Sequence, residues 1–138
     1  MERGGRSGGR VVVCDDTEQI RRLIRVNLEL EGMEVEEVSD GEALLNLLQA
    51  SDTIPDVITL DAQMAPRDGW WAIKRIRRDP RLAAIPVVMV TASVQEHDRI
   101  QASHAGLDAF IAKPFDPDRL VELIAGFVAQ GRAYHPEP

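Results

Sequence analysis

The chain contains two kinds of segment: short runs of apolar residues, and longer stretches in which apolar residues recur at helical spacing. Short apolar runs bounded by turn-forming or charged residues are typical of buried strands, and they lie at residues 11–14, 33–38, 57–60, 87–90 and 109–112. Between these runs, apolar residues recur every three or four positions, as on one face of a helix. We expect the helices to begin near Thr17, Asp40, Asp68, Gln95 and Pro117. Regular alternation of strand and helix predicts an α/β protein with a parallel sheet.

Right-handed crossovers leave few topologies for such a chain. We expect a flavodoxin-like, doubly wound, five-stranded parallel sheet of order 2-1-3-4-5 flanked by five helices. The folded domain is expected over residues 10–130. Residues 1–9 are mostly Gly and Arg and predict a flexible arm, and residues 131–138 have no packing pattern and predict a flexible tail.

Length and charge restrict the classes of function. A chain of 138 residues is long enough for one domain with its own core. The single Cys14 permits no internal disulfide, and the chain has no apolar stretch of the roughly 20 residues that span a bilayer. The net charge of −7 disfavours nucleic acid. We therefore expect a cytoplasmic protein without membrane insertion or direct nucleic-acid binding.

Polar residues follow four of the five predicted strands. Because the carboxyl ends of parallel strands open onto one crevice, these residues are expected to meet there. Two carboxylates about 4 Å apart repel by roughly 4 kcal/mol at an effective dielectric constant near 20, so a cluster of three favours a divalent cation, and oxygen ligands favour Mg²⁺. An ammonium, a hydroxyl and a metal around one carboxylate are typical of phosphoryl transfer through an aspartyl phosphate. The residues concerned are Asp15, Asp16, Asp61, Thr91 and Lys113.

With these residues in register from about Arg10 to Gln130, the chain resembles a receiver domain of two-component response regulators, similar to the single-domain chemotaxis regulators. The resemblance implies that Asp61 accepts a phosphoryl group from a histidine kinase or a histidine phosphotransfer protein. It implies a Mg²⁺ site formed by Asp15, Asp16, Asp61 and the backbone carbonyl of Gln63. It also implies that the phosphoryl oxygens are held by Thr91, Ala92 and Lys113.

The resemblance further implies a switch. Thr91 would turn toward the phosphoryl group, and Phe110 would rotate into the vacated space. The surface formed by the fourth helix, fifth strand and fifth helix would then bind an unknown downstream protein differently. The Lys113-Pro114 peptide is expected to be cis. Such a domain is a phosphoacceptor with at most slow self-catalysed phosphorylation and dephosphorylation, and not an enzyme.

Two alternatives stay open beside this interpretation, and a third, a phosphohydrolase, is disfavoured. The chain is a receiver fragment of a larger regulator or hybrid kinase, or it is a binding module that keeps the fold without phosphorylation. The loop after Met64 supports the binding module, because Pro66 is shifted there by one position from the usual receiver pattern. A phosphohydrolase would carry an acid two residues after its nucleophile, where this chain has Gln63.

A basic cluster with one tryptophan lies in the third predicted helix. Trp71 shares a side of this helix with Lys74, Arg75 and Arg78. We expect Trp71 to lie flat over arginine side chains and the cluster to be solvated. An acidic patch of a partner is the alternative.

Overall fold

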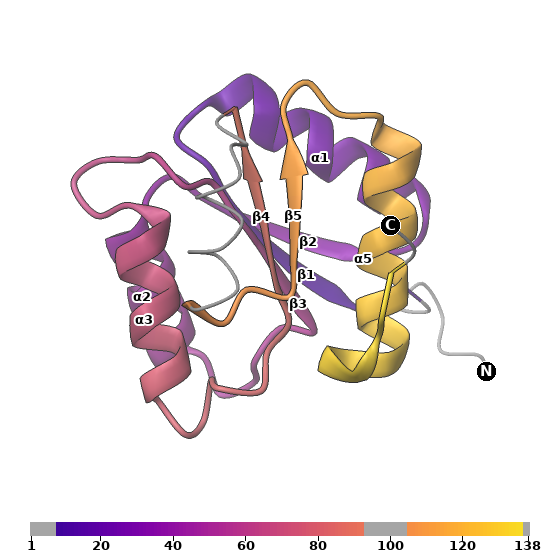
Figure 1. Cartoon of the computed structure of the whole chain (residues 1–138). Helices are drawn as coiled ribbons and strands as arrows, with labels where there is room; N and C mark the ends of the chain where they lie inside the picture. Colours follow the sequence, from indigo (N-terminus) through magenta and orange to yellow (C-terminus); the bar gives the residue numbers. More distant parts are fainter. Residues whose placement is uncertain (1–7, 93–104, 137–138) are drawn as a thin grey trace.

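The computed structural model describes residues 8–92 and 105–136 and contains one parallel sheet of order β2-β1-β3-β4-β5 (Figure 1). All four pairs of neighbouring strands are parallel. The predicted flavodoxin-like topology is therefore confirmed. The strands are β1 (Arg10–Cys14), β2 (Glu34–Val38), β3 (Val57–Leu60), β4 (Val87–Thr91) and β5 (Ala109–Ala112).

Helices cover both faces of the sheet. In Figure 1, α2 (Gly41–Ala50) and α3 (Gly69–Arg78) lie side by side on one face, and α1 (Glu18–Leu30) and α5 (Pro117–Gln130) lie on the other. A short 3₁₀ helix, η2 (Gly131–Ala133), follows α5. The helix expected over about 95–105 lies almost wholly within residues 93–104, which are outside the described residues. Residues 1–7, most of the expected N-terminal arm, are also outside them. Among the helices that the structure describes, none is long and apolar enough to cross a membrane.

The described α-helices begin next to the residues predicted for their starts, and three of them are capped by an aspartate. Side chains of Asp40, Asp68 and Asp116 accept backbone N–H groups in the first turns of α2, α3 and α5. Thr17 precedes α1 but makes no side-chain cap bond. Its N–H instead donates to Asp15 Oδ1 at 2.9 Å, so the aspartate of the preceding loop fixes the start of α1.

The sheet separates two hydrophobic cores. Alternate side chains of β1 point to opposite faces, with Val12 and Cys14 toward α2 and α3, and Val11 and Val13 toward α1 and α5. The central strands are apolar at almost every position because helices cover both faces. Two layers of helices thus hold the central strands, and with them the strand ends, in place.

The segment after α5 packs against the domain, although the sequence predicts a loose tail there. The Tyr134 ring meets the Phe127 ring edge-on, with centroids 5.0 Å apart and an interplanar angle of 83°. Gly126 leaves room for this ring, because a Cβ at that position would overlap it. Arg132 Nε donates to Asp108 at 2.8 Å. One tyrosine and one arginine in a short segment produce no periodicity, and so the sequence pattern gives no sign of this packing.

Candidate functional site

Three carboxylates lie together at the carboxyl ends of β1 and β3. Parallel pairing sets Cys14 beside Leu60, and the Asp61 N–H donates to the Cys14 carbonyl at 3.0 Å. Ligand oxygens of Asp15, Asp16 and Asp61 lie within 4.8 Å of one another. Asp15 and Asp61 are buried, whereas Asp16 is exposed. This set of oxygen donors fits a hard divalent cation such as Mg²⁺ or Mn²⁺.

Lys113 adds a positive charge to this cluster from the end of β5. Its Nζ lies 2.9 Å from Asp15 Oδ2 and 3.4 Å from Asp61 Oδ2. Burial alone would lower the pKa of Lys113, but the hydrogen bond that Lys113 donates to Asp15 and the charges of both carboxylates outweigh it and raise that pKa above its ordinary 10.5. The lysine is therefore held fully charged between two carboxylates.

The carboxyl group of Asp61 has a raised pKa. Burial is the largest cause and the charge of Asp15 the second, while Lys113 and the N–H of Gln63 act in the opposite direction. A cation at the cluster would stabilise the ionised form and reverse the effect. Asp61 is thus a carboxylate whose nucleophilic form depends on positive charge nearby.

The other residues expected at the site lie on β4 and β5 and in the segments that follow β3 and β4. Thr91 is buried at the end of β4, and its carbonyl accepts the N–H of Lys113 at 2.8 Å. Ala92 follows it and is exposed. Gln63 has an exposed side chain, and its N–H donates to Asp61 Oδ1 at 3.3 Å. Phe110 is half-buried on β5, two positions before the residue that pairs with Thr91.

Arg21 is a positioning residue for the acidic pair that the sequence did not reveal. From the first turns of α1, its Nη1 donates to the Asp15 carbonyl at 2.7 Å and its Nε to Glu37 on β2 at 3.1 Å. In the sequence, the only sign of this role is that Arg21 is a charged residue close to the apolar positions Ile20 and Ile24. Such a pattern is more often a solvated helix face.

The loop between β3 and α3 places the start of α3 against Asp61. The Gly69 N–H donates to the Ala62 carbonyl at 3.0 Å, and a Cβ on Gly69 would overlap the Asp61 carbonyl. The Ala65-Pro66 peptide is cis, as is Lys113-Pro114, which confirms the expectation for the second. Arg67 does not face the carboxylates, because its guanidinium lies over the Trp71 ring.

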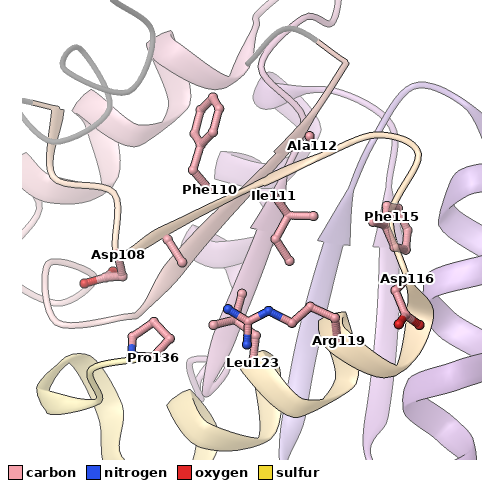
Figure 2. A pocket seen from close by; sticks show the side chains of 10 residues that line it. Asp108, Phe110, Ile111, Ala112, Phe115, Asp116, Arg119, Leu123 and Pro136 are labelled. Atoms are coloured by element: carbon pink, nitrogen blue, oxygen red, sulfur yellow. The ribbon is translucent and has the colours of Figure 1, made fainter. Parts of the chain in front are cut away.

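A shallow groove of about 490 Å³ lies between β5 and α5 (Figure 2). Phe110 and Ile111 leave β5 on opposite sides, as neighbours on a strand do. Most residues that line the groove are apolar, and Asp108, Asp116 and Arg119 also line it, together with Pro136 of the C-terminal segment. Part of the surface expected to bind a downstream protein is therefore hollow and partly apolar.

A parallel α/β domain with three carboxylates and a lysine at its strand ends has the architecture of a phosphorylation-dependent signalling domain. The chain belongs to the response regulator receiver domain family, whose model matches residues 11–125. It is 39% identical over 115 residues to the DNA-binding dual master transcriptional regulator RpaA of Synechocystis, covering 81% of this chain and 46% of that protein. It is 36% identical to the phosphate regulon regulatory protein PhoB of Escherichia coli, covering 83% of this chain and 49% of that protein. The chain thus spans about half the length of these curated relatives.

Solved receiver structures share the fold. A putative response regulator from Chloroflexus aurantiacus superposes with a TM-score of 0.83 at 27% identity, covering 90% of this chain and all of that one. The chemotaxis response regulator CheY4 of Vibrio cholerae gives 0.80 at 26% identity, covering 88% of this chain and 99% of that one. The phosphorylated cyanobacterial phytochrome response regulator RcpA gives 0.75 at 27%, covering 87% of this chain and 91% of that one. The family predicted from the sequence is confirmed.

Proposed function

We propose that Asp61 is the phosphoacceptor of this receiver domain and that Mg²⁺ bound by the three carboxylates is required for the transfer. The observation that carries the proposal is the convergence of Asp15, Asp16 and Asp61 with the ammonium of Lys113. Receiver domains interact with histidine kinases or phosphotransfer proteins, and a phosphohistidine of such a partner is the proposed donor. Phosphorylation of the similar protein RcpA supports the same chemistry here.

The transfer itself is an in-line displacement at phosphorus. An Asp61 carboxylate oxygen forms a bond to the phosphorus atom, the bond from phosphorus to the histidine nitrogen breaks, and the imidazole leaves with that electron pair. The metal ion, when bound, neutralises charge on the carboxylates and the phosphoryl oxygens. Asp16 and Asp61 are the proposed direct ligands, Asp15 acts through water, and Gln63 contributes its backbone carbonyl. Lys113 is close enough to Asp61 to pair with a phosphoryl oxygen carried there.

The proposed switch uses the end of β4 and the middle of β5. The Thr91 hydroxyl and the Ala92 N–H would bind phosphoryl oxygens, since Thr91 is the last residue of β4, the strand beside β3, and Ala92 follows it. Phe110 is only half-buried, so its ring has room to move when Thr91 turns. The surface that responds would be the β5–α5 groove together with the helix that the sequence predicts near residues 95–105, and a downstream protein is its proposed partner.

The domain signals by carrying a phosphoryl group, and slow self-catalysed loss of that group is part of the proposal. RpaA and PhoB are transcriptional regulators about twice the length matched here, so a direct protein partner, and not DNA, is proposed for the described domain. A cytoplasmic location is also proposed, because Cys14 is a free, buried thiol.

Intact-mass spectrometry after incubation with acetyl phosphate and Mg²⁺ tests the function. One phosphoryl adduct is expected in the wild type and in the control Asp52→Asn, which changes an exposed acid elsewhere. None is expected in Asp61→Asn or in the presence of EDTA. An adduct that persists in Asp61→Asn would contradict the acceptor. If no adduct and no binding of beryllofluoride were detected in the wild type, the phosphorylation-independent binding module would be favoured instead.

A further inference from the structure

The arginines around α3 fall into two groups. Arg77 and Arg81 have structural partners: Arg77 donates to Asp108 and to three backbone carbonyls, and Arg81 donates to carbonyls at the end of α2. In contrast, Arg67, Arg75 and Arg78, together with Lys74, are exposed. Within residues 8–92 and 105–136, none of these four side chains forms an ion pair or donates a hydrogen bond to the protein.

These four exposed cations lie beside Trp71, on one side of α3 and in the loop before it. Positions 71, 74, 75 and 78 are spaced as neighbours on one side of a helix, and Arg67 reaches the same ring from the preceding loop. We call this set, Arg67, Trp71, Lys74, Arg75 and Arg78, the α3 basic face. Like charges three and four residues apart destabilise a helix by a few tenths of a kcal/mol per pair, although the C-terminal end of the helix dipole offsets part of this. The arrangement is therefore not explained by helix stability.

Trp71 orders two of these cations. The guanidinium carbon of Arg67 lies 5.2 Å from the ring centroid of Trp71, and that of Arg75 lies 4.8 Å from it. A guanidinium that stacks by its face keeps its N–H groups directed away from the ring, where they can bind a carboxylate in bidentate fashion. Tryptophan and arginine are also the residues that most often dominate binding energy at interfaces.

From these observations we propose that the α3 basic face is a docking surface for an acidic segment of a partner protein. The net negative charge of the whole chain favours a short acidic protein segment over nucleic acid as the partner. The chain carries a net charge of −7 despite the cations of this face, so a long polyanion would be repelled by the rest of the molecule. A short acidic segment contacts only the face itself, and an apolar side chain within it would pack against Trp71. The proposal does not depend on phosphorylation of Asp61.

The test uses defined probes and the indole N–H signals of the two adjacent tryptophans in ¹⁵N-labelled protein. The probe is a glutamate peptide of about ten residues with a central leucine, because acidic motifs are bound by arginine clusters. The matched peptide has glutamine in place of glutamate. Both tryptophans are half-buried against the core, but among the described residues only Trp71 carries stacked guanidiniums, so the Trp71 signal should shift on titration at low salt and the Trp70 signal should shift less. The glutamine peptide should give no shift.

Charge-reversal variants identify the surface. Arg75→Glu and Lys74→Glu should each weaken binding about tenfold, a change of roughly 1.4 kcal/mol. Arg22→Glu, an equal reversal at an exposed residue of α1, should leave affinity within about twofold, as is usual away from an interface. Thermal melts confirm that each variant is folded. A Trp71 signal that does not respond to the glutamate peptide, or an affinity unchanged in both α3 variants, would overturn the proposal. Tighter binding of an oligothymidylate of about ten nucleotides would also overturn it, in favour of nucleic acid.

Discussion

Lys113 Nζ lies closer to Asp15, at 2.9 Å, than to Asp61, at 3.4 Å. The lysine therefore pairs mainly with Asp15 and only secondarily with Asp61, the proposed phosphoacceptor. The side chain of Asp15 is 2% exposed and that of Asp61 8%, so neither carboxylate can rely on water alone for solvation. Lys113 thus provides a large part of the positive charge that this cluster needs before a cation binds.

Lys113→Met should destabilise the metal-free domain at neutral pH by about 2–4 kcal/mol, because it leaves two buried carboxylates without their partner. Lys74→Met removes an exposed lysine with no ion pair in the described part of the chain and should cost less than about 0.5 kcal/mol. Urea denaturation in EDTA measures both. Addition of Mg²⁺ should recover part of the loss in Lys113→Met, and equal stability of the two variants would contradict this account.

Asp61→Asn should stabilise the metal-free domain at neutral pH. The folded-state pKa of Asp61 lies above its ordinary value of 3.8, because of burial and then the charge of Asp15. The folded state therefore binds this proton more tightly than the unfolded state. The stabilisation that the group provides is complete below 3.8 and is lost as the pH rises through the raised folded pKa.

Thermal melts in EDTA across the acid-to-neutral range check this prediction. The advantage of Asp61→Asn over the wild type should shrink as the pH falls toward about 4, where the wild-type carboxyl becomes protonated. It should also shrink or reverse when Mg²⁺ is added, since the metal stabilises only a cluster that binds it. A wild type more stable than the variant at neutral pH without metal would refute the assigned shift.

Gly126→Ala should destabilise the domain although alanine is the better helix former. Inside a helix, alanine is favoured over glycine by about 1 kcal/mol. Here, however, the new Cβ would displace the Tyr134 ring and break its contact with Phe127. In a Tyr134→Ala background the same substitution should become stabilising. Calorimetric melts of the four proteins of this double-mutant cycle measure the coupling, and an equal effect of Gly126→Ala in both backgrounds would show that the ring does not rest there.

Asp108 should contribute more through Arg77 than through Arg132. Both guanidiniums lie 2.8 Å from its carboxylate, but the Arg77 side chain is 14% exposed and that of Arg132 39%. Burial and then the charge of Arg132 lower the pKa of Arg77 to about 10, while Asp108 acts in the opposite direction. Asp108→Ala should cost about 2–4 kcal/mol, whereas Arg132→Ala should cost at most about 1 kcal/mol, as exposed pairs do. Denaturant midpoints for the two variants test the difference.

The strand order and the residues of the site were predictable because both follow from strong local signals. Asp15, Asp61 and Lys113 each follow a short apolar run, and the rule that parallel strands open at one edge brings them together. The predicted overlap of Trp71 with arginine side chains is confirmed, since residues four apart on a helix are neighbours.

What the sequence could not supply were contacts between distant residues without a repeating pattern. The hydrogen bond from Arg21 to the Asp15 carbonyl depends on how α1 leaves its loop. The packing of Tyr134 on Gly126 depends on the chain turning back after α5. Neither contact produces a periodic pattern in the sequence. Each involves one side chain that packs against or hydrogen-bonds to the backbone of a distant residue.

The division of the interior into two cores has a consequence for how this domain can change over time. Val12 and Val13 are adjacent in the chain but contribute to separate hydrophobic clusters on opposite faces of β1. Substitutions in one cluster therefore reach the other only through the strand backbone, and their energetic effects should add. Each helical layer is then free to accumulate changes of its own. The shared strands, and the carboxylates at their ends, keep their geometry while the two outer surfaces diverge toward different partners.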